Sequence, residues 1–242
     1  RADHHGHGTE MGGLALYGDL GPVLADGAPV VLRHRLESVK ILPPPGKPTN
    51  EPDLYGAITA EASSLPEIEA PTRRRCFSMA VTDRSTGRRG RPTSWSAAID
   101  ALAAGRTFDS SSNGLVYLDD EEKNARRLFI VSAGNVDPDA IGPDHLALSD
   151  TQPIHDPAQA WNALIVGACT DLTNVDPADG TWAGWRALAP TGELSPFSAT
   201  SLLFEEDWPI KPDVVFEGGN VACSPAGTEV DFPVPSLSVL ST

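Results

Sequence analysis

Three histidines lie near the start of the 242-residue chain, within residues 3–13 (DHHGHGTEMGG). A histidine at the start of a helix can be held in place by the backbone, and a glycine after it lets other chain segments come close. Because its ordinary pKa is about 6.5, imidazole can accept and donate a proton near neutral pH. His7, which precedes Gly8 and Thr9, is therefore a candidate for proton transfer.

Two other interpretations of this segment stay open. His4, His5 and His7 could bind a metal ion and serve a metal-dependent hydrolase, although two of them are adjacent and no carboxylate or thiolate set accompanies them. They could also form a polar helix start without a function. The rest of the chain is needed to choose between these interpretations.

A second segment combines an apolar strand with small residues and an amide. Residues 128–131 (LFIV) form a continuous apolar run, which is typical of a strand covered on both faces. The run leads directly into residues 132–135 (SAGN). Taken alone, this pattern is also that of an ordinary strand that ends in a turn.

Together with further segments, these two resemble the subtilisin-like serine peptidases (subtilases, or S8-type peptidases). In that family G-H-G-T is followed by a pair of small residues inside a new helix, as in residues 3–13, and residues 132–135 resemble its oxyanion segment. Along the chain, residues 37–42 (ESVKIL) resemble the strand after the histidine helix, residues 78–82 (SMAVT) the substrate-binding edge strand, and residues 211–215 (KPDVV) the segment before the catalytic serine. Phe197-Ser198 also matches a Phe-Ser pair of the family. Coincidence is a poor explanation for so many segments in one order.

The resemblance implies a role for each of these segments. His7 would act as general base and then as general acid, and the side-chain amide of Asn135 would stabilise the oxyanion. Substrate would add to residues 78–82 as an extra strand. The residues expected to line the substrate cleft are Ala80, Val81, Thr82, Ser132, Ala133 and Gly134. The small side chains among them suit a roomy first subsite.

The chain also departs from the family pattern. A subtilisin-type triad runs Asp, His, Ser along the chain, yet only six residues precede His7 and no later serine lies in a G-T-S-x-A-type motif. Residues 227–229 (GTE) place glutamate where the motif needs serine, and residues 216–219 (FEGG) replace the expected A-P-G. We therefore expect a single domain over residues 1–242 that lacks the Asp strand and the Ser helix. As an excerpt it would be inactive, and the alternative is a catalytically inactive peptide-binding scaffold of the same fold.

The elements that position these residues alternate between helices and strands. Apolar residues at helical spacing predict helices over residues 7–17, 54–65 and 94–104, and apolar runs predict strands over residues 29–32, 38–42, 76–82, 128–131, 163–166 and 214–216. Such alternation indicates a mostly parallel sheet. With the resemblance, it implies an α/β fold of the subtilisin-like three-layer type, a mostly parallel central sheet flanked by helices. Gly12-Gly13 is costly inside a helix, about 1 kcal/mol for each glycine, and so predicts close packing against another backbone.

Composition limits the partners and the compartment. A net charge of −15 argues against direct binding of nucleic acid, and no apolar stretch of membrane-spanning length occurs. We interpret the basic residues 73–75 and 84–91 as a strand edge and a solvated loop, with an acidic partner site as the alternative.

The three cysteines are widely spaced, which argues against a disulfide framework and for a reducing compartment, here the cytoplasm. Cys76 and Cys169 are expected to be small core residues. No cofactor is expected. Calcium sites are frequent in the family, but no acidic loop here can be assigned to one. The expected partner is a peptide or protein substrate, and the oligomeric state is not predicted.

Overall fold

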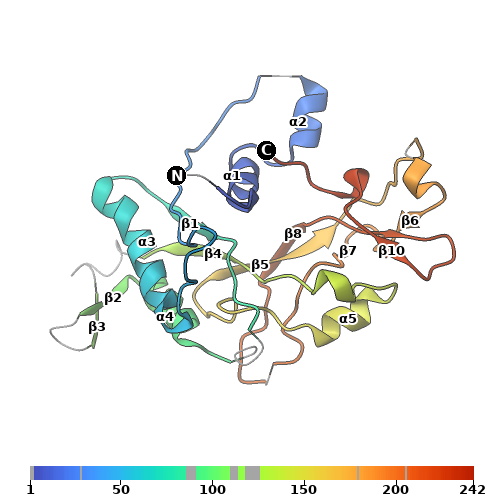
Figure 1. Cartoon of the computed structure of the whole chain (residues 1–242). Coiled ribbons are helices and arrows are strands. Elements are labelled where there is room, and N and C mark those ends of the chain that lie inside the picture. The colour runs from blue at the N-terminus through green and yellow to red at the C-terminus, as the bar shows by residue number, and fades with distance from the viewer. Residues whose placement is uncertain are drawn as a thin grey trace.

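The computed structural model shows a mixed α/β fold with helices packed around a mostly parallel sheet (Figure 1). It describes residues 3–27, 29–85, 91–109, 114–117, 126–178, 180–204 and 206–242. The helices are α1 (His7–Tyr17), α2 (Leu20–Asp26), α3 (Tyr55–Glu69), α4 (Ser94–Ala103) and α5 (His145–Thr151), with short 3-10 helices at Pro52–Leu54, Pro138–Ala140, Gly180–Trp182 and Pro235–Leu237. The predicted fold class is confirmed.

The central sheet brings together strands that are far apart in the sequence. Its strands are β1 (Cys76–Met79), β4 (Leu128–Ser132), β5 (Leu164–Thr170), β7 (Glu193–Leu194) and β8 (Val214–Glu217). The order is β1-β4-β5-β7, and β8 also pairs with β5. The pairs β1–β4, β4–β5 and β5–β8 are parallel, whereas β7 is antiparallel to β5. Because parallel strands end at the same edge of a sheet, the segments after β1 and β4 emerge side by side.

Two smaller sheets complete the described strands. One contains β6 (Arg186–Ala187), β9 (Ala222–Cys223) and β10 (Val230–Asp231), and the other pairs β2 (Arg106–Asp109) with β3 (Gly114–Tyr117). Both are antiparallel.

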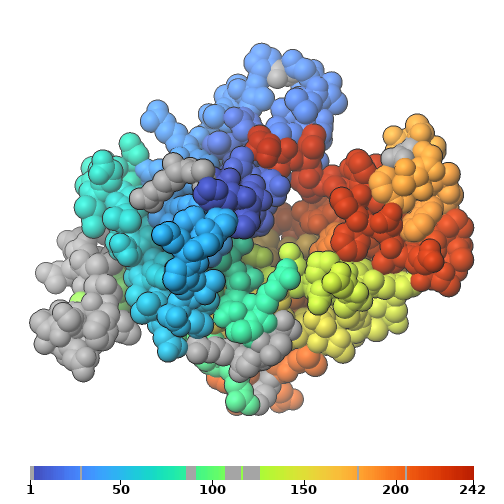
Figure 2. Space-filling view, viewed as in Figure 1, coloured from blue at the N-terminus to red at the C-terminus, as the bar shows by residue number. Residues whose placement is uncertain are grey.

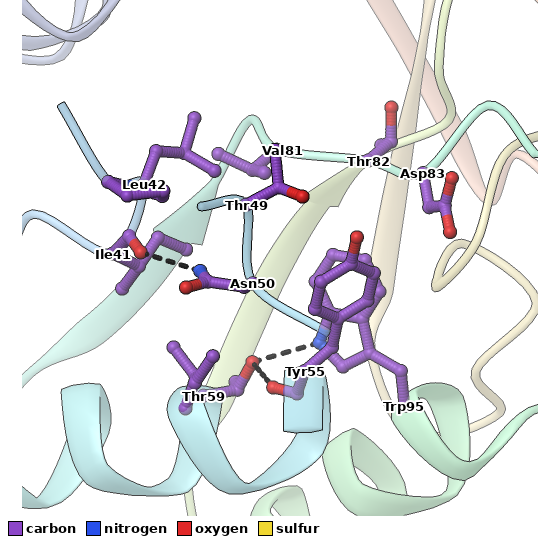
Figure 3. A pocket seen from close by; sticks show the side chains of 12 residues that line it. Ile41, Leu42, Thr49, Asn50, Tyr55, Thr59, Val81, Thr82, Asp83 and Trp95 are labelled. Atoms are coloured by element: carbon purple, nitrogen blue, oxygen red, sulfur yellow. Dashed lines mark hydrogen bonds between the residues drawn. The ribbon is translucent and has the colours of Figure 1, made fainter. Parts of the chain in front are cut away.

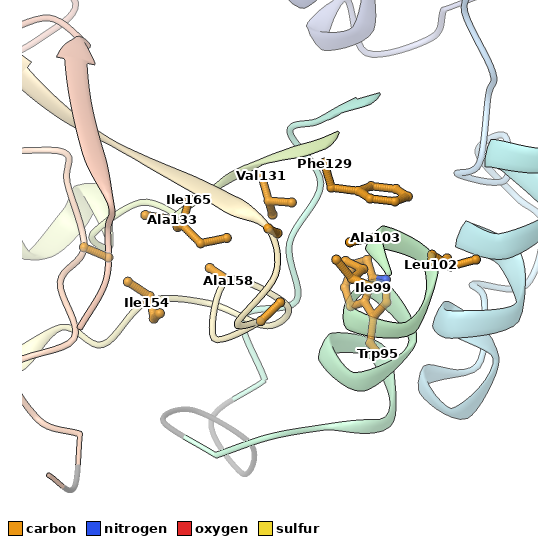
Figure 4. Packing of buried hydrophobic residues seen from close by; sticks show 13 residues of the cluster. Trp95, Ile99, Leu102, Ala103, Phe129, Val131, Ala133, Ile154, Ala158 and Ile165 are labelled. Carbon is orange, nitrogen blue, oxygen red and sulfur yellow. The ribbon is translucent and has the colours of Figure 1, made fainter. Parts of the chain in front are cut away.

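The main hydrophobic core lies between α4 and the sheet (Figure 4). Trp95, Ile99 and Leu102 recur at helical spacing on α4 and are all buried, as predicted for this helix. They pack in one cluster with Phe129 and Val131 of β4. The core thus fixes the position of β4, the strand that leads into the candidate oxyanion segment.

Helix α1 packs against the C-terminal end of the chain through Gly13. A Cβ atom at Gly13 would lie 2.7 Å from the Ser241 hydroxyl oxygen and 3.1 Å from the Thr242 backbone nitrogen. The Ser241 hydroxyl donates to the carbonyl of Glu10, and Figure 2 shows the red C-terminal residues against the dark blue helix. The prediction that Gly12-Gly13 permits close packing against backbone is therefore confirmed at Gly13; Gly12 faces Leu36 instead.

Two of the predicted strands do not form. Residues 29–32 and 38–42 are extended or irregular chain without strand pairing. In the first segment Val31 remains 79% exposed. An apolar run becomes a strand only where another strand pairs with it, and no described strand pairs with these segments. The prediction that they are strands was wrong.

Two predictions of burial were also wrong. Each residue of β8 is exposed, including Phe216 at 65%, although the apolar run over residues 214–216 is typical of a strand covered on both faces. Cys76 is exposed at the start of the edge strand β1 and is not a core residue.

The predicted helix over residues 54–65 extends further, to Glu69.

The glycine pair of α1 yields a first prediction. Replacing glycine by alanine inside a helix normally stabilises it by about 1 kcal/mol. At Gly13, however, the added methyl group would meet backbone and two hydroxyl groups of residues 241 and 242. We expect Gly13→Ala to lower the free energy of unfolding by about 1–2 kcal/mol, since overpacking of this kind costs about 1–3 kcal/mol.

Gly12→Ala is the matched control for urea-induced unfolding. Its added methyl group would approach only the Leu36 side chain, at 3.1 Å, which can rotate away. This variant should be neutral or slightly stabilised. Equal stability of the two variants would show that the contact between α1 and the C-terminal residues is not tight.

Candidate active site

The start of α1 is fixed by the carboxylate of Asp3. This group accepts hydrogen bonds from the backbone N–H groups of His5 and Gly6, each at 3.2 Å, and from both the backbone N–H and the hydroxyl of Thr9, at 2.8 and 2.9 Å. The Thr9 amide, followed by the Thr9 hydroxyl and the His5 amide, lowers the pKa of Asp3 to about 2. His7 is the first residue of the helix and is exposed to solvent. Asp3 therefore shapes the backbone turn that presents His7, a role that the sequence reasoning missed.

Asn135 lies at the other candidate position, three residues after the end of β4. Its neighbours Gly134 and Val136 are buried, whereas Asn135 itself is exposed. The backbone on both sides is held by the segment around Ser198: the Val136 N–H donates to the Phe197 carbonyl at 3.0 Å, and Asn135 forms a β-bridge with Ser198. The side-chain amide is thus presented to solvent by a fixed backbone.

The six residues predicted to line the cleft come from two neighbouring strands. In the β1–β4 ladder Met79 pairs with Val131, so residues 80–82 and 132–134 continue from adjacent strand ends. In α/β proteins, ligands bind in the crevice beyond the carboxyl ends of parallel strands. Both predicted walls therefore begin at the same edge of the sheet, and of their residues Ala133 is buried in the main core.

A cavity of about 170 Å³ adjoins the first of these walls (Figure 3). It is lined by Val81, Thr82 and Asp83 on one side and by apolar side chains such as Tyr55 and Trp95 on another. The rings of Tyr55 and Trp95 pack at a centroid distance of 4.8 Å. The cavity can accept an apolar side chain next to the edge strand.

A second, more open cavity adjoins the first. Both are lined by residues 41–43 and Asn50, and the second also reaches Lys40 and His4. The segment over residues 38–42 thus lines this groove although it forms no strand. His4 stands three residues before His7, so the groove connects the histidine segment with the edge strand. Within the described part of the chain, no hydrogen bond or ion pair joins His7 to Asn135.

Three other segments were considered as possible parts of a site: the histidines as metal ligands, Ser198 as a nucleophile, and residues 227–229 as the serine motif. Among the described residues, which include His4, His5 and His7, no group of three or more His, Cys, Asp or Glu side chains could hold a metal ion. The Ser198 hydroxyl is buried and accepts a hydrogen bond from the Ala168 N–H at 3.0 Å. Residues 227–229 form the turn of the hairpin between β9 and β10, not the start of a helix.

The basic residues 73–75 pair within the chain itself. Arg73 and Arg75 both bind the carboxylate of Glu37, and these two guanidinium groups, Arg75 first, lower the pKa of Glu37 to about 2. This cluster ties the segment before the groove to the segment before β1. Arg84 and Arg91 border residues 86–90, which lie outside the described residues.

Comparison with known proteins agrees with this architecture. The model of the subtilase family, peptidase S8, matches residues 1–240. The chain therefore belongs to the subtilase family, whose members are serine peptidases. No curated protein matches the chain. No helix in the described ranges is long and apolar enough to cross a membrane.

The hydrogen bonds that the Asp3 carboxylate accepts at the start of α1, here called the Asp3 cap, yield a prediction about pH. Because the pKa of Asp3 is about 2 in the folded protein and 3.8 ordinarily, its stabilising contribution is present above about pH 4 and is lost as the pH falls through about 2. We expect the backbone amide resonance of Thr9 to shift with a midpoint near pH 2, measured by NMR. In Asp3→Asn that shift should disappear, whereas in the control Asp53→Asn it should persist. A midpoint near 4 in the unmodified chain would contradict the proposed cap.

The polar contact beneath the first cavity yields a prediction about stability. The buried indole N–H of Trp95 donates to the Thr59 hydroxyl at 2.8 Å, and that hydroxyl donates to the Tyr55 carbonyl at 2.8 Å. Thr59→Val removes the acceptor and should cost about 1–3 kcal/mol in the free energy of unfolding. In a Trp95→Phe background the same change should cost at least about 1 kcal/mol less, measured by urea unfolding. Additive effects would show that the hydrogen bond contributes nothing.

Proposed function

We propose that this chain is part of a serine endopeptidase that hydrolyses peptide bonds through an Asp/His/Ser triad and an asparagine oxyanion donor. His7 takes the proton of the attacking serine and later gives it to the leaving amine. Asn135 stabilises the oxyanion of the tetrahedral intermediate. The aspartate that orients His7 and the serine that attacks are supplied by other segments of a longer protein.

Two adjoining cavities, which share residues 41–43 and Asn50 in their linings and together form a groove, are the observation that carries this proposal. It extends from Val81 and Thr82 beside the edge strand, past residues 41–43, to His4 in the segment that presents His7. A peptide lying in this groove would have its backbone beside the edge strand and one end near the histidine helix. A peptidase needs this juxtaposition of substrate and general base.

The edge position of β1 suits the binding of an extended peptide. Among the described strands, β1 pairs only with β4, so no described strand pairs with its other side. Main-chain hydrogen bonds along such an edge supply affinity, and pockets for alternate side chains supply specificity. The cavity lined by Tyr55 and Trp95 is one such pocket.

The C-terminal segment approaches the histidine helix. The Thr242 hydroxyl donates to the carbonyl of Thr9, two residues after His7. This contact holds the C-terminal segment beside the first turn of α1.

The free cysteines support the proposal of a reducing, cytoplasmic compartment. Cys76, Cys169 and Cys223 are all unpaired, and Cys76 is exposed. Exposed free thiols are more common where glutathione keeps them reduced.

The test uses the full-length parent protein and its kinetics. We expect a fluorophosphonate probe to label the parent, and His7→Ala to abolish the labelling. Asn135→Ala should lower kcat for peptide hydrolysis by about 10² to 10³ with little change in KM, because the oxyanion forms only in the transition state. The exposed Asn174 offers the matched control, Asn174→Ala, which should leave kcat unchanged. A folded parent that binds peptide but is never labelled would instead be an inactive scaffold.

A further inference from the structure

The backbone contact between Asn135 and Ser198 fixes the strand end that carries the candidate oxyanion donor. The two residues lie directly opposite each other in an antiparallel β-bridge. On one side of this pair the Val136 N–H donates to the Phe197 carbonyl at 3.0 Å. On the other side the N–H after Ser198 donates to the carbonyl before Asn135 at 3.4 Å. The position of the Asn135 backbone therefore depends on the position of Ser198.

The Ser198 hydroxyl anchors its own segment to β5. The pairing of β5 with β4 ends at Val166, and beyond it both backbone groups of Ala168 bind residues 195–198. The Ala168 N–H donates to the Ser198 hydroxyl at 3.0 Å, and the Ala168 carbonyl accepts from the Ser195 N–H at 3.0 Å. Residues 195–198 thus continue the hydrogen bonding of β5 after its pairing with β4 has ended.

This anchor is closed to solvent. Ser198 is 2% exposed, and a Cβ atom at Gly167 would lie 2.9 Å from its Oγ, so the hydroxyl packs directly against the backbone of β5. The buried Ser195 hydroxyl donates to the carbonyl of Gly219 at 2.7 Å, which ties the same segment to the chain after β8. Because Ser198 is closed to solvent, a variant without its oxygen leaves the Ala168 N–H without this acceptor.

We propose that Ser198 is a positioning residue for the oxyanion donor, because its hydroxyl holds the segment opposite Asn135 against β5. An oxyanion donor must reach a charge that forms only in the transition state, and a misplacement of about 1 Å can cost about 10²-fold in rate. Ser198 itself acts only through Asn135. The inference rests on the proposed peptidase function, since it assigns a residue that supports the same site.

Two variants of nearly equal shape isolate the hydroxyl in the full-length parent. Ser198→Thr keeps the acceptor oxygen, whereas Ser198→Val replaces it by a methyl group. We expect kcat for peptide hydrolysis to be about 10 to 10² times lower in Ser198→Val than in Ser198→Thr, with KM values within about threefold of each other. Equal kcat values in the two variants would overturn the inference.

Thr170→Val is the matched control for loss of a buried hydroxyl on β5. Thr170 is fully buried, and its hydroxyl accepts from the Leu172 N–H at 3.1 Å. This substitution removes the same kind of acceptor without touching the segment opposite Asn135, so kcat should stay unchanged. A loss of kcat as large as that of Ser198→Val would show that any buried hydroxyl of this strand has the effect, and would overturn the specific role of Ser198.

Ser198→Ala, which adds no atoms, tests whether the effect passes through Asn135. We expect it to lower kcat by about 10 to 10² in the otherwise unmodified parent, but by less than about threefold in an Asn135→Ala background. Equal losses in both backgrounds would show that Ser198 acts on the active site by some other route. That result would overturn the inference.

Hydrogen exchange of the parent gives a readout that needs no activity. The buried Val136 N–H is bound to the Phe197 carbonyl, and it should exchange at least about fivefold faster in Ser198→Val than in Ser198→Thr. Faster exchange in a parent that a fluorophosphonate never labels supports the link between Ser198 and Asn135 and overturns the peptidase. A labelled parent with equal exchange in the two variants overturns the role of Ser198 and leaves the peptidase intact.

Discussion

The parallel pairing of β1 with β4 is the constraint on which the rest of the site depends. In-register pairing from Cys76–Leu128 to Met79–Val131 makes both strands end at the same edge of the sheet. From there one chain segment continues to Thr82 and the groove, and the other continues to Asn135. A shift of register by one residue would turn every side chain to the opposite face, so the burial of Phe129 and Val131 also determines which way the segments after the strands face.

The histidine helix is held by a different kind of interaction. α1 contributes only Gly13 to the buried residues and has no apolar face in the main core. Its position instead depends on the Asp3 cap at its start and on close backbone contact with residues 241 and 242. The site therefore joins a strand pair fixed by core packing to a helix fixed by polar contacts. Since polar surface contacts contribute less than core burial, α1 is the part of the site that the protein holds least firmly.

The helices α1, α3 and α4 and the four strands of the parallel pairs were predicted well, whereas two apolar runs that find no partner strand were wrongly predicted as strands. The limits of α1 follow from glycines at both ends, and the buried face of α4 follows from the spacing of Trp95, Ile99 and Leu102, so both could be predicted from short stretches of sequence. The failed strands at residues 29–32 and 38–42 have strand-like composition, but pairing depends on chain segments elsewhere. The same reason explains why the packing of the buried His155 ring against Thr82 and Gly134 was not predicted, since these residues are 73 and 21 positions away along the chain.

The K-P-D segment shows how a motif used for recognition can have a purely structural basis. The ammonium group of Lys211 is buried and contacts both carboxylate oxygens of Asp213, at 2.8 and 3.0 Å, as well as the carbonyl of Ala163. One of those carboxylate oxygens also accepts from the Ile165 N–H at 2.7 Å. A buried lysine without such partners would be strongly destabilising, so the motif must occur as a unit. It joins the start of β5 to the start of β8 and so fixes the register of that pair, and none of its residues lines the groove. The motif is therefore evidence for the fold, whereas the proposed catalytic function depends on the groove, the histidine helix and the exposed amide of Asn135.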